Sequence, residues 1–395
     1  MRWHEKVVDF FGLKKSVVAL LLMVIFVGLG EKMAERFLPI YLLALGGGIL
    51  SVGFLNGMDN LLSALYSFPG GYLSDRLGYK RALVVFNLVA MSGYLIVILF
   101  PHWLAVFVGA AFFLSWSAIS LPATMSLVSR ALPQEKRTMG VSVHSLTRRI
   151  PMALGPVIGG VLIGLYGERT GIRLAFVAAF LLGIVSLILQ QAMIEDDGRR
   201  GKAEKRPTRL WRSMSPDLRN LLVSDILIRF AEQIPYAFVV VWCMKNNGIS
   251  AVQFGFLTTV EMATAMLVYI PVAYLADRTT KKPFVLITFV NFTIFPLFLL
   301  FSHSFWMMVI AFIIRGLKEF GEPTRKALIM DLAPEDQKAG MFGLYYLIRD
   351  VVVSIAAFAS GLLWQLSPAV NLLTATACGL IGTIYFAVRG RDLKG

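Results

Sequence analysis

Long apolar runs recur along the whole chain and limit what it can fold into. A helix needs roughly 20 apolar residues to cross about 30 Å of hydrocarbon, where every backbone polar group must be paired inside the protein. The chain is 57% hydrophobic and 16% charged, whereas soluble domains carry about 25% charged residues. We therefore predict an all-α membrane protein with twelve transmembrane helices, at residues 17–45, 50–73, 82–100, 103–129, 139–165, 172–193, 218–244, 250–275, 284–301, 304–330, 340–365 and 369–388.

The positive charge of the chain is unevenly placed. A formal net charge of +14 raises the question of a nucleic-acid partner. With the N-terminus inside, however, most Lys and Arg residues fall in cytoplasmic segments, and the external loops carry Arg169, Arg173 and Lys245. This distribution follows the positive-inside rule. It predicts a multi-pass protein of the plasma membrane with both termini cytoplasmic, in contact with membrane lipids and without a nucleic-acid partner.

The chain contains an internal repeat. A basic polar segment, residues 195–217, separates six predicted spans from six others. When the halves are shifted by about two hundred residues they align, pairing Glu35 with Glu232, Asp59 with Glu261, Asp75 with Asp277, Pro122 with Pro323 and Arg148 with Arg349. We predict an N-terminal half (1–194), a cytoplasmic linker (195–217) and a C-terminal half (218–395). Parallel six-helix repeats of this kind are a transporter architecture with a substrate site near the membrane midplane.

The segment GGYLSDRLGYKR, residues 70–81, carries a family resemblance. It resembles the loop between the second and third helices of the major facilitator superfamily, and AYLADRTTKK (273–282) is a weaker second copy. The resemblance extends to the twelve spans and the 6+6 repeat. It implies the major facilitator fold and a conformational latch that contacts the opposite half, formed here by Asp75, Arg76, Gly78, Lys80 and Arg81, with Asp277 and Arg278 in the second copy.

A second resemblance concerns the fifth span. PMALGPVIGG (151–160) is similar to the Gly-Pro segment of drug:proton antiporters, matched at Gly155, Pro156, Gly159 and Gly160. Small residues at this spacing let helices approach closely, and a proline loosens the helical backbone where a gate can bend. The antiporter arginine of the fourth span has no counterpart, because this span holds no base before Arg130.

Ionisable residues within the predicted spans are the main candidates for a site. A charge at the bilayer centre costs about 2.5–3.5 kcal/mol on insertion scales, so such residues face a cavity or a partner. The chain places many there: Glu31, Lys32, Glu35, Arg36, Asp59, Arg148, Arg149, Asp225, Arg229, Glu232, Glu261, Arg315, Lys318, Glu319, Glu322, Arg349 and Asp350.

The stretch RGLKEFGEP (315–323) concentrates these charges in the predicted tenth span. Read as one helix, it allows ion pairs at four-residue spacing between Arg315 and Glu319 and between Lys318 and Glu322. Helical spacing likewise predicts local pairs of Asp225 with Arg229 and of Glu322 with Arg325 or Lys326. The family resemblance places this helix beside the central cavity with the first, fourth and seventh. The predicted substrate cavity therefore includes Glu35, Trp116, Arg148, Arg229, Arg315, Lys318, Glu319, Glu322 and Arg349. The alternative is that these charges neutralise one another and only hold the bundle together.

Proton coupling requires a carboxylate whose protonation changes with exposure. Asp225 and Glu232 of the seventh span are the first candidates, followed by Glu31 of the first. Pro235 follows directly and predicts a broken helix whose carbonyl groups are free to join the site. Arg229 and Arg315 are alternatives of another kind, because a guanidinium clasps an anionic substrate bidentately.

The sequence thus predicts a secondary active transporter, a proton-coupled exporter of a small organic molecule that acts as a monomer. The alternative is an importer or exchanger of organic anions; a non-transporting receptor or scaffold is less favoured, because the latch motif is retained. The chain is not expected to be an enzyme, since no nucleophile and base can be assembled. Two cysteines and four histidines show no metal-binding spacing, so neither a metal nor a cofactor is expected.

Overall fold

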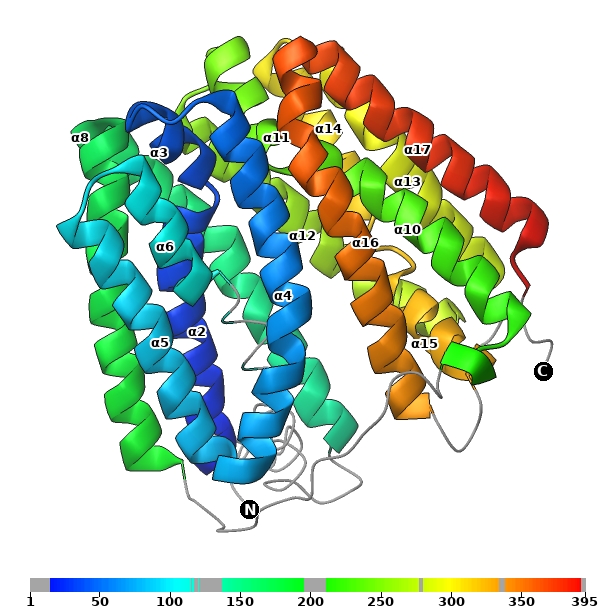
Figure 1. Cartoon of the computed structure of the whole chain (residues 1–395), viewed down its shortest axis with the longest axis horizontal. Coiled ribbons are helices and arrows are strands. Elements are labelled where there is room, and N and C mark those ends of the chain that lie inside the picture. Colours follow the sequence, from blue (N-terminus) through cyan, green and yellow to red (C-terminus); the bar gives the residue numbers. More distant parts are fainter. Residues whose placement is uncertain are drawn as a thin grey trace. The chain divides into compact units, whose positions relative to one another are not determined.

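The computed structural model describes residues 15–114, 116, 120, 137–194, 211–276, 280–333 and 338–391. Every regular element in these residues is helical (Figure 1). The predicted all-α class is therefore confirmed. Large apolar side chains such as Leu267, Trp306 and Leu366 are exposed, which is the arrangement expected of helices that face lipid rather than water.

The first part of the chain forms α2 (Lys15–Glu35), α3 (Leu38–Ala44), α4 (Ile49–Leu77), α5 (Tyr79–Leu99), α6 (Trp103–Phe113) and α8 (Arg137–Met193). α8 is two helices joined at a kink. Gly167 lies at this kink with φ of 78° and ψ of 169°, a backbone conformation that favours glycine. The kink falls between the predicted spans 139–165 and 172–193.

The second part forms α10 (Pro216–Tyr236), α11 (Phe238–Val241), the π-helix η2 (Trp242–Asn246), α12 (Ala251–Ala276), α13 (Lys282–Leu300), α14 (Phe305–Leu317), α15 (Glu322–Leu332), α16 (Lys338–Leu366) and α17 (Pro368–Arg389). The helix axis bends by 41° between α10 and the α11–η2 segment. The bend follows Pro235, as the sequence predicted, because proline cannot donate the helical hydrogen bond.

Twelve membrane spans remain a prediction. By length and apolarity, six helices of the described residues can cross a membrane, or seven if α10 and the bent segment after it form one span. Some predicted spans are interrupted: 17–45 comprises α2 and α3, and 304–330 comprises α14 and α15. α6 is short, and much of the span predicted at 103–129 lies outside the described residues.

The chain divides into two compact units. The first comprises residues 1–46 and 62–204, and the second comprises residues 47–61 and 205–395. The first half of α4 thus packs with the second unit, where a Cβ added to Gly53 would lie 2.5 Å from the Cα of Gly361 in α16. The predicted halves, which divide at the linker 195–217, stay a prediction.

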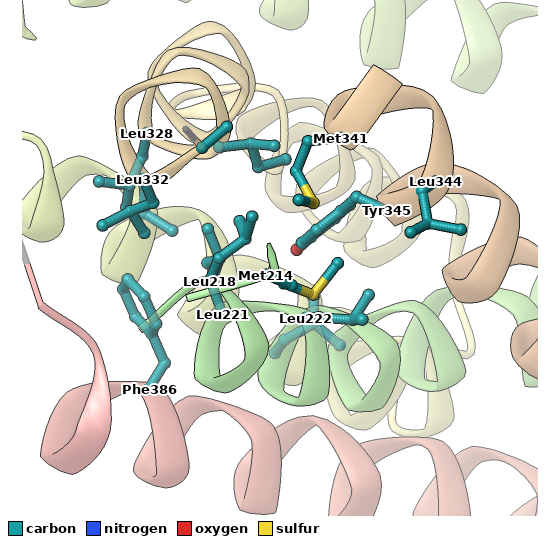
Figure 2. Close-up of a cluster of buried hydrophobic side chains, with 14 of the residues drawn as sticks. Met214, Leu218, Leu221, Leu222, Leu328, Leu332, Met341, Leu344, Tyr345 and Phe386 are labelled. Carbon is teal, nitrogen blue, oxygen red and sulfur yellow. The ribbon is translucent and has the colours of Figure 1, made fainter. Parts of the chain in front are cut away.

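An apolar cluster fills one end of the second unit. Figure 2 shows Leu218 and Leu222 of α10, Leu332 of α15, Met341 of α16 and Phe386 of α17 converging on one another. These side chains are at least nine-tenths buried. The cluster fixes α15 and α16 against α10, and these are the helices that carry most of the charged side chains described below.

Glycines set the contact between α2 and α8 in the first unit. A Cβ on Gly159 would lie 2.1 Å from the carbonyl oxygen of Met33, and one on Gly155 would lie 2.7 Å from the Cβ of Lys32. The two helices therefore meet backbone to backbone at these residues. This is the close approach that the small-residue pattern predicted, whereas bending at Pro156 stays a prediction.

We expect Gly159→Ala to lower the free energy of unfolding by about 1–3 kcal/mol, because the new methyl group forces α2 and α8 apart. A melting curve of the purified full-length protein measures the effect. Gly343→Ala in α16 is the matched control, because a Cβ there meets no atom within 4 Å. Equal melting temperatures for both variants would contradict the predicted tight contact.

Candidate functional site: a buried charge network

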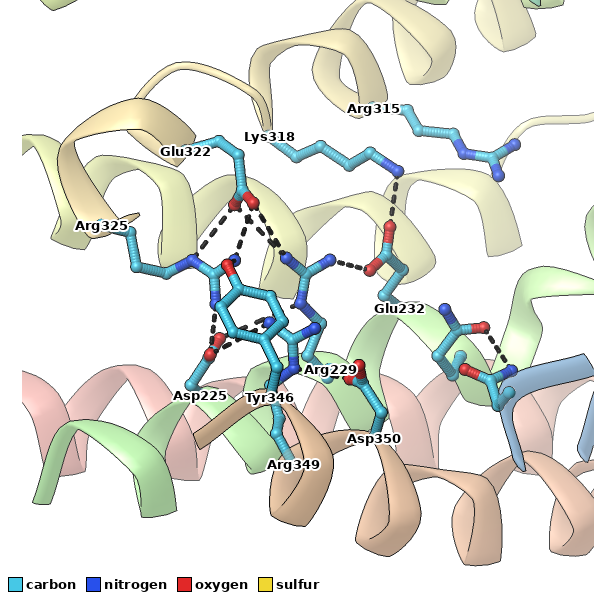
Figure 3. A network of polar contacts seen from close by, with 12 residues as sticks. Asp225, Arg229, Glu232, Arg315, Lys318, Glu322, Arg325, Tyr346, Arg349 and Asp350 are labelled. Atoms are coloured by element: carbon cyan, nitrogen blue, oxygen red, sulfur yellow. Dashed lines mark hydrogen bonds and ion pairs between the residues drawn. The ribbon is translucent and has the colours of Figure 1, made fainter. Parts of the chain in front are cut away.

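The second unit holds a network of buried acids and bases (Figure 3). Its members come from helices that are far apart in sequence: Asp225, Arg229 and Glu232 of α10, Glu261 of α12, Arg315 of α14, Lys318 of the turn after it, Glu322 and Arg325 of α15, and Arg349 and Asp350 of α16. Buried charges persist only where each is paired. Carboxylates and bases are equal in number in this set, so the network is balanced.

Asp225 is the centre of the network. Its Oδ2 accepts hydrogen bonds from the hydroxyl of Tyr345 at 3.0 Å, from Nη1 of Arg349 at 3.4 Å and from Nη1 of Arg325. Its Oδ1 has no hydrogen-bond donor among the described residues, and Nε of Arg229 lies 3.9 Å from it. The carboxylate is 1% exposed and is held by three donors on one oxygen.

Arg325 connects Asp225 to Glu322, and it contacts Glu322 through a bidentate ion pair. Its Nη2 lies 2.7 Å from Oε1 of Glu322 and its Nε lies 3.1 Å from Oε2, so the guanidinium grips both carboxylate oxygens. Arg325 is among the largest fully buried side chains of the protein. The sequence pattern named Arg325 only as a local partner of Glu322 and not as a site residue. The available signal was its place inside the predicted span 304–330, three residues after Glu322.

Two tyrosines complete the centre, and the charge pattern gave no indication of either. The Tyr345 hydroxyl donates to Asp225, and the guanidinium carbon of Arg349 lies 4.1 Å from the ring centre of Tyr346. Nε of Arg349 donates to Asp350 at 2.7 Å. Arg349 is thus oriented by an aromatic face as well as by two carboxylates.

A second group of the network extends along α10 toward α12 and α14. Glu232 accepts from Nη1 of Arg229 at 2.5 Å and from Nζ of Lys318 at 2.7 Å. Glu261 lies 3.3 Å from Nε of Arg315 and 3.6 Å from Nζ of Lys318. Arg229 also reaches Glu322 at 3.3 Å, which connects this group to the centre.

The expected one-helix pairing in RGLKEFGEP requires a correction. α14 ends at Leu317 and residues 318–321 form turns before α15 begins, so the stretch is not one helix. Lys318 accordingly pairs with Glu232 and Glu261 on other helices rather than along its own helix. Arg315 likewise pairs with Glu261. The predicted local pairs of Glu322 with Arg325 and with Lys326 do form, as does the longer contact between Asp225 and Arg229.

Gly321 is one reason for the break between α14 and α15. A Cβ there would lie 2.3 Å from the carbonyl oxygen of Phe284, and the backbone N–H of Gly321 donates to Oγ1 of Thr288 at 2.5 Å. The turn therefore packs directly on α13. Pro323 follows in the first turn of α15, where proline is tolerated.

The carbonyl groups at the bend after α10 are not free, contrary to expectation. The carbonyl of Gln233 accepts from Nδ2 of Asn56 in α4 at 2.7 Å, and that of Ile234 accepts from Nδ2 of Asn371 in α17 at 3.3 Å. Asn371 also donates to the carbonyl of Ser360 at 2.9 Å. Two buried asparagines therefore satisfy the backbone that the bend exposes.

The first unit has a smaller charged group on α2. Nζ of Lys32 lies 3.1 Å from Oε1 of Glu31 and also forms an ion pair with Glu35, and all three side chains are largely buried. The shift that aligns Glu35 with Glu232 also aligns Lys32 with Arg229. The ion pair of Lys32 with Glu35 and that of Arg229 with Glu232 therefore occupy equivalent places in the two halves, and in each the two residues are three positions apart. Arg148, another predicted cavity residue, is partly buried on α8.

Trp116 takes part in a buried chain of hydrogen bonds within the first unit. Its Nε1–H donates to Oδ1 of Asn87 at 2.7 Å, and Nδ2 of Asn87 donates to Oε1 of Gln190 at 2.9 Å. Nε2 of Gln190 in turn donates to the carbonyl of Lys80 at 2.8 Å. The polar atom of Trp116 is therefore already engaged, and its predicted contact with substrate stays a prediction.

The predicted latch is described in part. Gly78 separates α4 from α5 with φ of 81°, which fits glycine, and Nζ of Lys80 donates to the carbonyl of Gln191 at 3.2 Å. Arg81 is exposed. Asp75 and Arg76 lie in the last turn of α4, and their side chains are outside the described set, as are Asp277 and Arg278 entirely. Among described residues, no group of His, Cys, Asp or Glu is arranged to hold a metal.

Comparison with known proteins gives the family. The model of the Major Facilitator Superfamily matches residues 20–231 and 221–395. The uncharacterized MFS-type transporter MJ1317 of Methanocaldococcus jannaschii is 21% identical over 363 residues, covering 89% of each chain. The multi-drug resistance efflux pump PmrA of Streptococcus pneumoniae is 28% identical over 226 residues, covering 52% of each.

Solved structures share the fold. A POT family transporter in complex with a thioalcohol-conjugated peptide gives a TM-score of 0.79 at 13% identity, over 94% of this chain and 95% of that one. An inward-facing bacterial homolog of the human lysosomal transporter Spinster gives 0.73 at 14% identity, over 95% of each. Since the family model matches nearly the whole chain, this multi-pass membrane protein belongs to the Major Facilitator Superfamily of secondary transporters.

Proposed function

We propose that the protein is a proton-coupled exporter of a small organic solute that works by alternating access. In this proposal it is a monomer of the plasma membrane with both termini cytoplasmic. The observation that carries proton coupling is the group formed by Glu31, Lys32 and Glu35. Two buried carboxylates share the ammonium of Lys32 there, and Arg36 and Arg148 also act on them electrostatically. A proton that arrives from one side of the membrane and binds one of these carboxylates changes the charge of the group.

Asp225 and Glu232 were the first candidates for the coupling acid, and their surroundings favour Glu31 over them. Asp225 accepts from two arginines and a tyrosine, and Glu232 accepts from Arg229 and Lys318. Each carboxylate is thus already compensated by at least two donors. A proton would have to displace those donors, so we assign these acids to holding the network and Glu31 to carrying the proton.

The direction of transport is proposed from two likenesses. The Gly-Pro segment at 151–160 resembles that of drug:proton antiporters, and PmrA, a multi-drug resistance efflux pump, is similar over about half of its length. Both support an antiport mechanism in which protons enter as solute leaves. The solute itself is restricted only by the polar, charged character of the buried network.

Uptake by proteoliposomes under an imposed pH gradient tests this proposal. A panel of neutral, cationic and anionic compounds is offered to vesicles that are acidic or alkaline inside. Antiport accumulates solute in acidic vesicles, because outward proton flow drives solute inward. Accumulation in alkaline vesicles would instead show symport. Equal uptake with and without the pH gradient would contradict proton coupling.

The second candidate function is import or exchange of an organic anion. It is favoured by the buried arginines of the network, above all Arg315 and Arg349. The human organic anion transporter MFSD10 shares the fold with a TM-score of 0.67 at 13% identity. In the vesicle assay this function appears as anion uptake into alkaline vesicles, or as exchange against preloaded anion without any gradient. A receptor without turnover would show neither.

We expect Asp75→Asn to reduce the transport rate by roughly 5- to 150-fold, the range of a typical coupling energy, while substrate affinity changes less. The reason is that the proposed latch biases the exchange between conformations and lies outside the binding cavity. Transport rate and solute binding are measured on the same preparation. Asp217→Asn is the matched control, an acid in the first turn of α10 that is about one-third exposed. Unchanged turnover in Asp75→Asn would remove the latch assignment.

A further inference from the structure

Three helices of the second unit have their ends at one edge of it. α10 begins at Pro216, α13 begins at Lys282 and α17 ends at Arg389. α13 and α17 are long and apolar enough to cross a membrane, and so is α10 together with the bent segment after it. Nζ of Lys282 donates to the carbonyl of Ala387 at 2.8 Å, which places the start of α13 beside the end of α17. This edge is therefore where the second unit leaves the hydrocarbon and meets the lipid head groups.

α10 and α17 pack against each other and run in opposite directions up to this edge (Figure 1). The hydroxyl of Tyr385 donates to Oδ1 of Asn220 at 2.9 Å. Closer to the edge, Nε of Arg391 lies 3.9 Å from Oδ1 of Asp217. The beginning of α10 and the end of α17 are thus held together, and side chains next to these contacts on the two helices are neighbours.

The face that this helix pair turns outward is aliphatic. On α17, exposed side chains follow one another at three- and four-residue steps, which is the spacing of one helix face: Ile381, Ile384 and Val388. On α10, Val223 is 44% exposed and lies four residues after the exposed Arg219. Other faces of both helices, represented by Leu222 and Phe386, lie in the apolar cluster described above. The two exposed stripes therefore share the outer surface and present hydrocarbon to lipid.

Arg219 is oriented at the edge by Trp211. Its Nη2 donates to the carbonyl of Trp211 at 3.2 Å, and its guanidinium carbon lies 5.3 Å from the centre of the indole ring. Trp211 is 43% exposed, and tryptophan is enriched at the level of the lipid head groups. Arg219 contacts no carboxylate among the described residues, so its charge is available to a group outside the protein.

The end of α17 adds two more arginines to this edge. Arg389 is exposed, and no acid of the described part of the chain pairs with it. The side chain of Arg391 is 78% exposed, and its contact with Asp217 at 3.9 Å is of the kind that contributes less than about 1 kcal/mol. Positive charge is thus in excess here. Guanidinium groups bind phosphate oxygens bidentately, so the edge is complementary to a phosphate group.

We propose that the outer face of α10 and α17 binds one anionic phospholipid. Its phosphate contacts Arg219 and Arg391, and its acyl chains lie along Val223, Ile384 and Val388. The aliphatic stripes take the chains, and the arginines that lack a close carboxylate take the phosphate. In the proposed orientation the lipid belongs to the cytoplasmic leaflet. The site does not depend on which solute is transported or on whether transport is coupled to protons.

Binding of defined lipids tests the proposal. The full-length protein is purified in detergent, and three probes are added in steps: phosphatidylglycerol, phosphatidylcholine with the same acyl chains, and glycerol phosphate without chains. Native mass spectrometry counts the bound molecules, and a melting curve follows stability. We expect one phosphatidylglycerol to bind tightly and to raise the melting temperature. Phosphatidylcholine should bind more weakly because it carries no net charge, and glycerol phosphate should leave the melting temperature unchanged because it lacks the chains.

Substitutions at the two arginines test the residue assignment. We expect Arg219→Gln to lower the affinity for phosphatidylglycerol about fivefold, and the double variant with Arg391→Gln to lower it about 30-fold, because each base near an anionic lipid contributes about a fivefold preference. Lys326→Gln is the matched control. It removes one positive charge from α15, where the side chain is 46% exposed, and leaves the α10–α17 face unchanged. Each of these side chains is exposed, so the variants should fold.

Each outcome either supports or overturns the lipid site. Equal affinity of the unsubstituted protein for phosphatidylglycerol and phosphatidylcholine overturns it, as does a double arginine variant that binds phosphatidylglycerol as well as Lys326→Gln does. If glycerol phosphate binds as tightly as phosphatidylglycerol, the arginines bind a soluble phosphate and the lipid assignment fails. A loss of affinity in the arginine variants alone supports the site, whatever the vesicle assay shows about proton coupling.

Discussion

Arg325→Gln is expected to lower the free energy of unfolding by about 3–5 kcal/mol, enough to prevent recovery of folded protein from the membrane. The substitution removes the bidentate partner of Glu322 and one of the donors to Asp225. Both carboxylates then stay buried with less compensation, and that uncompensated charge is the source of the cost. Yield of monodisperse protein and its melting temperature in detergent measure the effect.

The double variant Arg325→Gln with Asp225→Asn should be more stable than Arg325→Gln alone, because the second change removes the carboxylate that the first leaves underpaired. Lys326→Gln is the matched control. It alters the neighbouring residue, which also contacts Glu322, but its side chain is 46% exposed and the expected effect is below about 1 kcal/mol. Similar stability for Arg325→Gln and Lys326→Gln would show that the buried pair does not hold α15 to α10.

The helical class and the position of most helices could be predicted from apolar runs, because lipid permits few other structures. The interruption between α14 and α15 could not. It depends on Gly321 packing on the carbonyl of Phe284, a contact between helices that no local pattern records. A pairing rule that assumes a continuous helix therefore fails for Lys318, although it holds for Glu322 and Arg325 inside α15.

The candidate site also contains some contacts that are local in sequence and others that depend on packing between helices. The ion pairs of Lys32 with Glu35 and of Arg229 with Glu232 are local, and the internal repeat aligns them. The pair of Arg325 with Asp225 joins residues one hundred positions apart, and the choice of Asp225 rather than another acid follows from how α15 packs on α10. Sequence spacing thus predicts the local ion pairs, while tertiary packing decides the partners that are distant in sequence.

Glu31→Gln is expected to abolish pH-driven accumulation while leaving exchange of preloaded solute intact. The amide has nearly the shape of the carboxylate and cannot bind or release the coupling proton. Exchange needs only the conformational change and no net proton transfer, so it should continue. The rates of gradient-driven uptake and of exchange are measured in the same proteoliposomes, with and without an imposed pH gradient. If Glu31→Gln keeps full gradient-driven transport, the coupling proton is assigned to Asp225 or Glu232 instead.

Two matched variants decide whether the effect belongs to Glu31 itself. Glu35→Gln removes the other carboxylate on Lys32, and Asp225→Asn removes the most heavily paired acid of the second unit. Glu35→Gln leaves Lys32 to pair with Glu31 alone, which favours the ionised carboxylate, so we expect gradient-driven transport to weaken while exchange continues. Asp225→Asn should instead lose stability and both transport modes together, since three buried donors then lack their anion. A loss confined to coupling in Glu31→Gln, beside a general loss in Asp225→Asn, separates the acid that moves a proton from the acid that holds the helices.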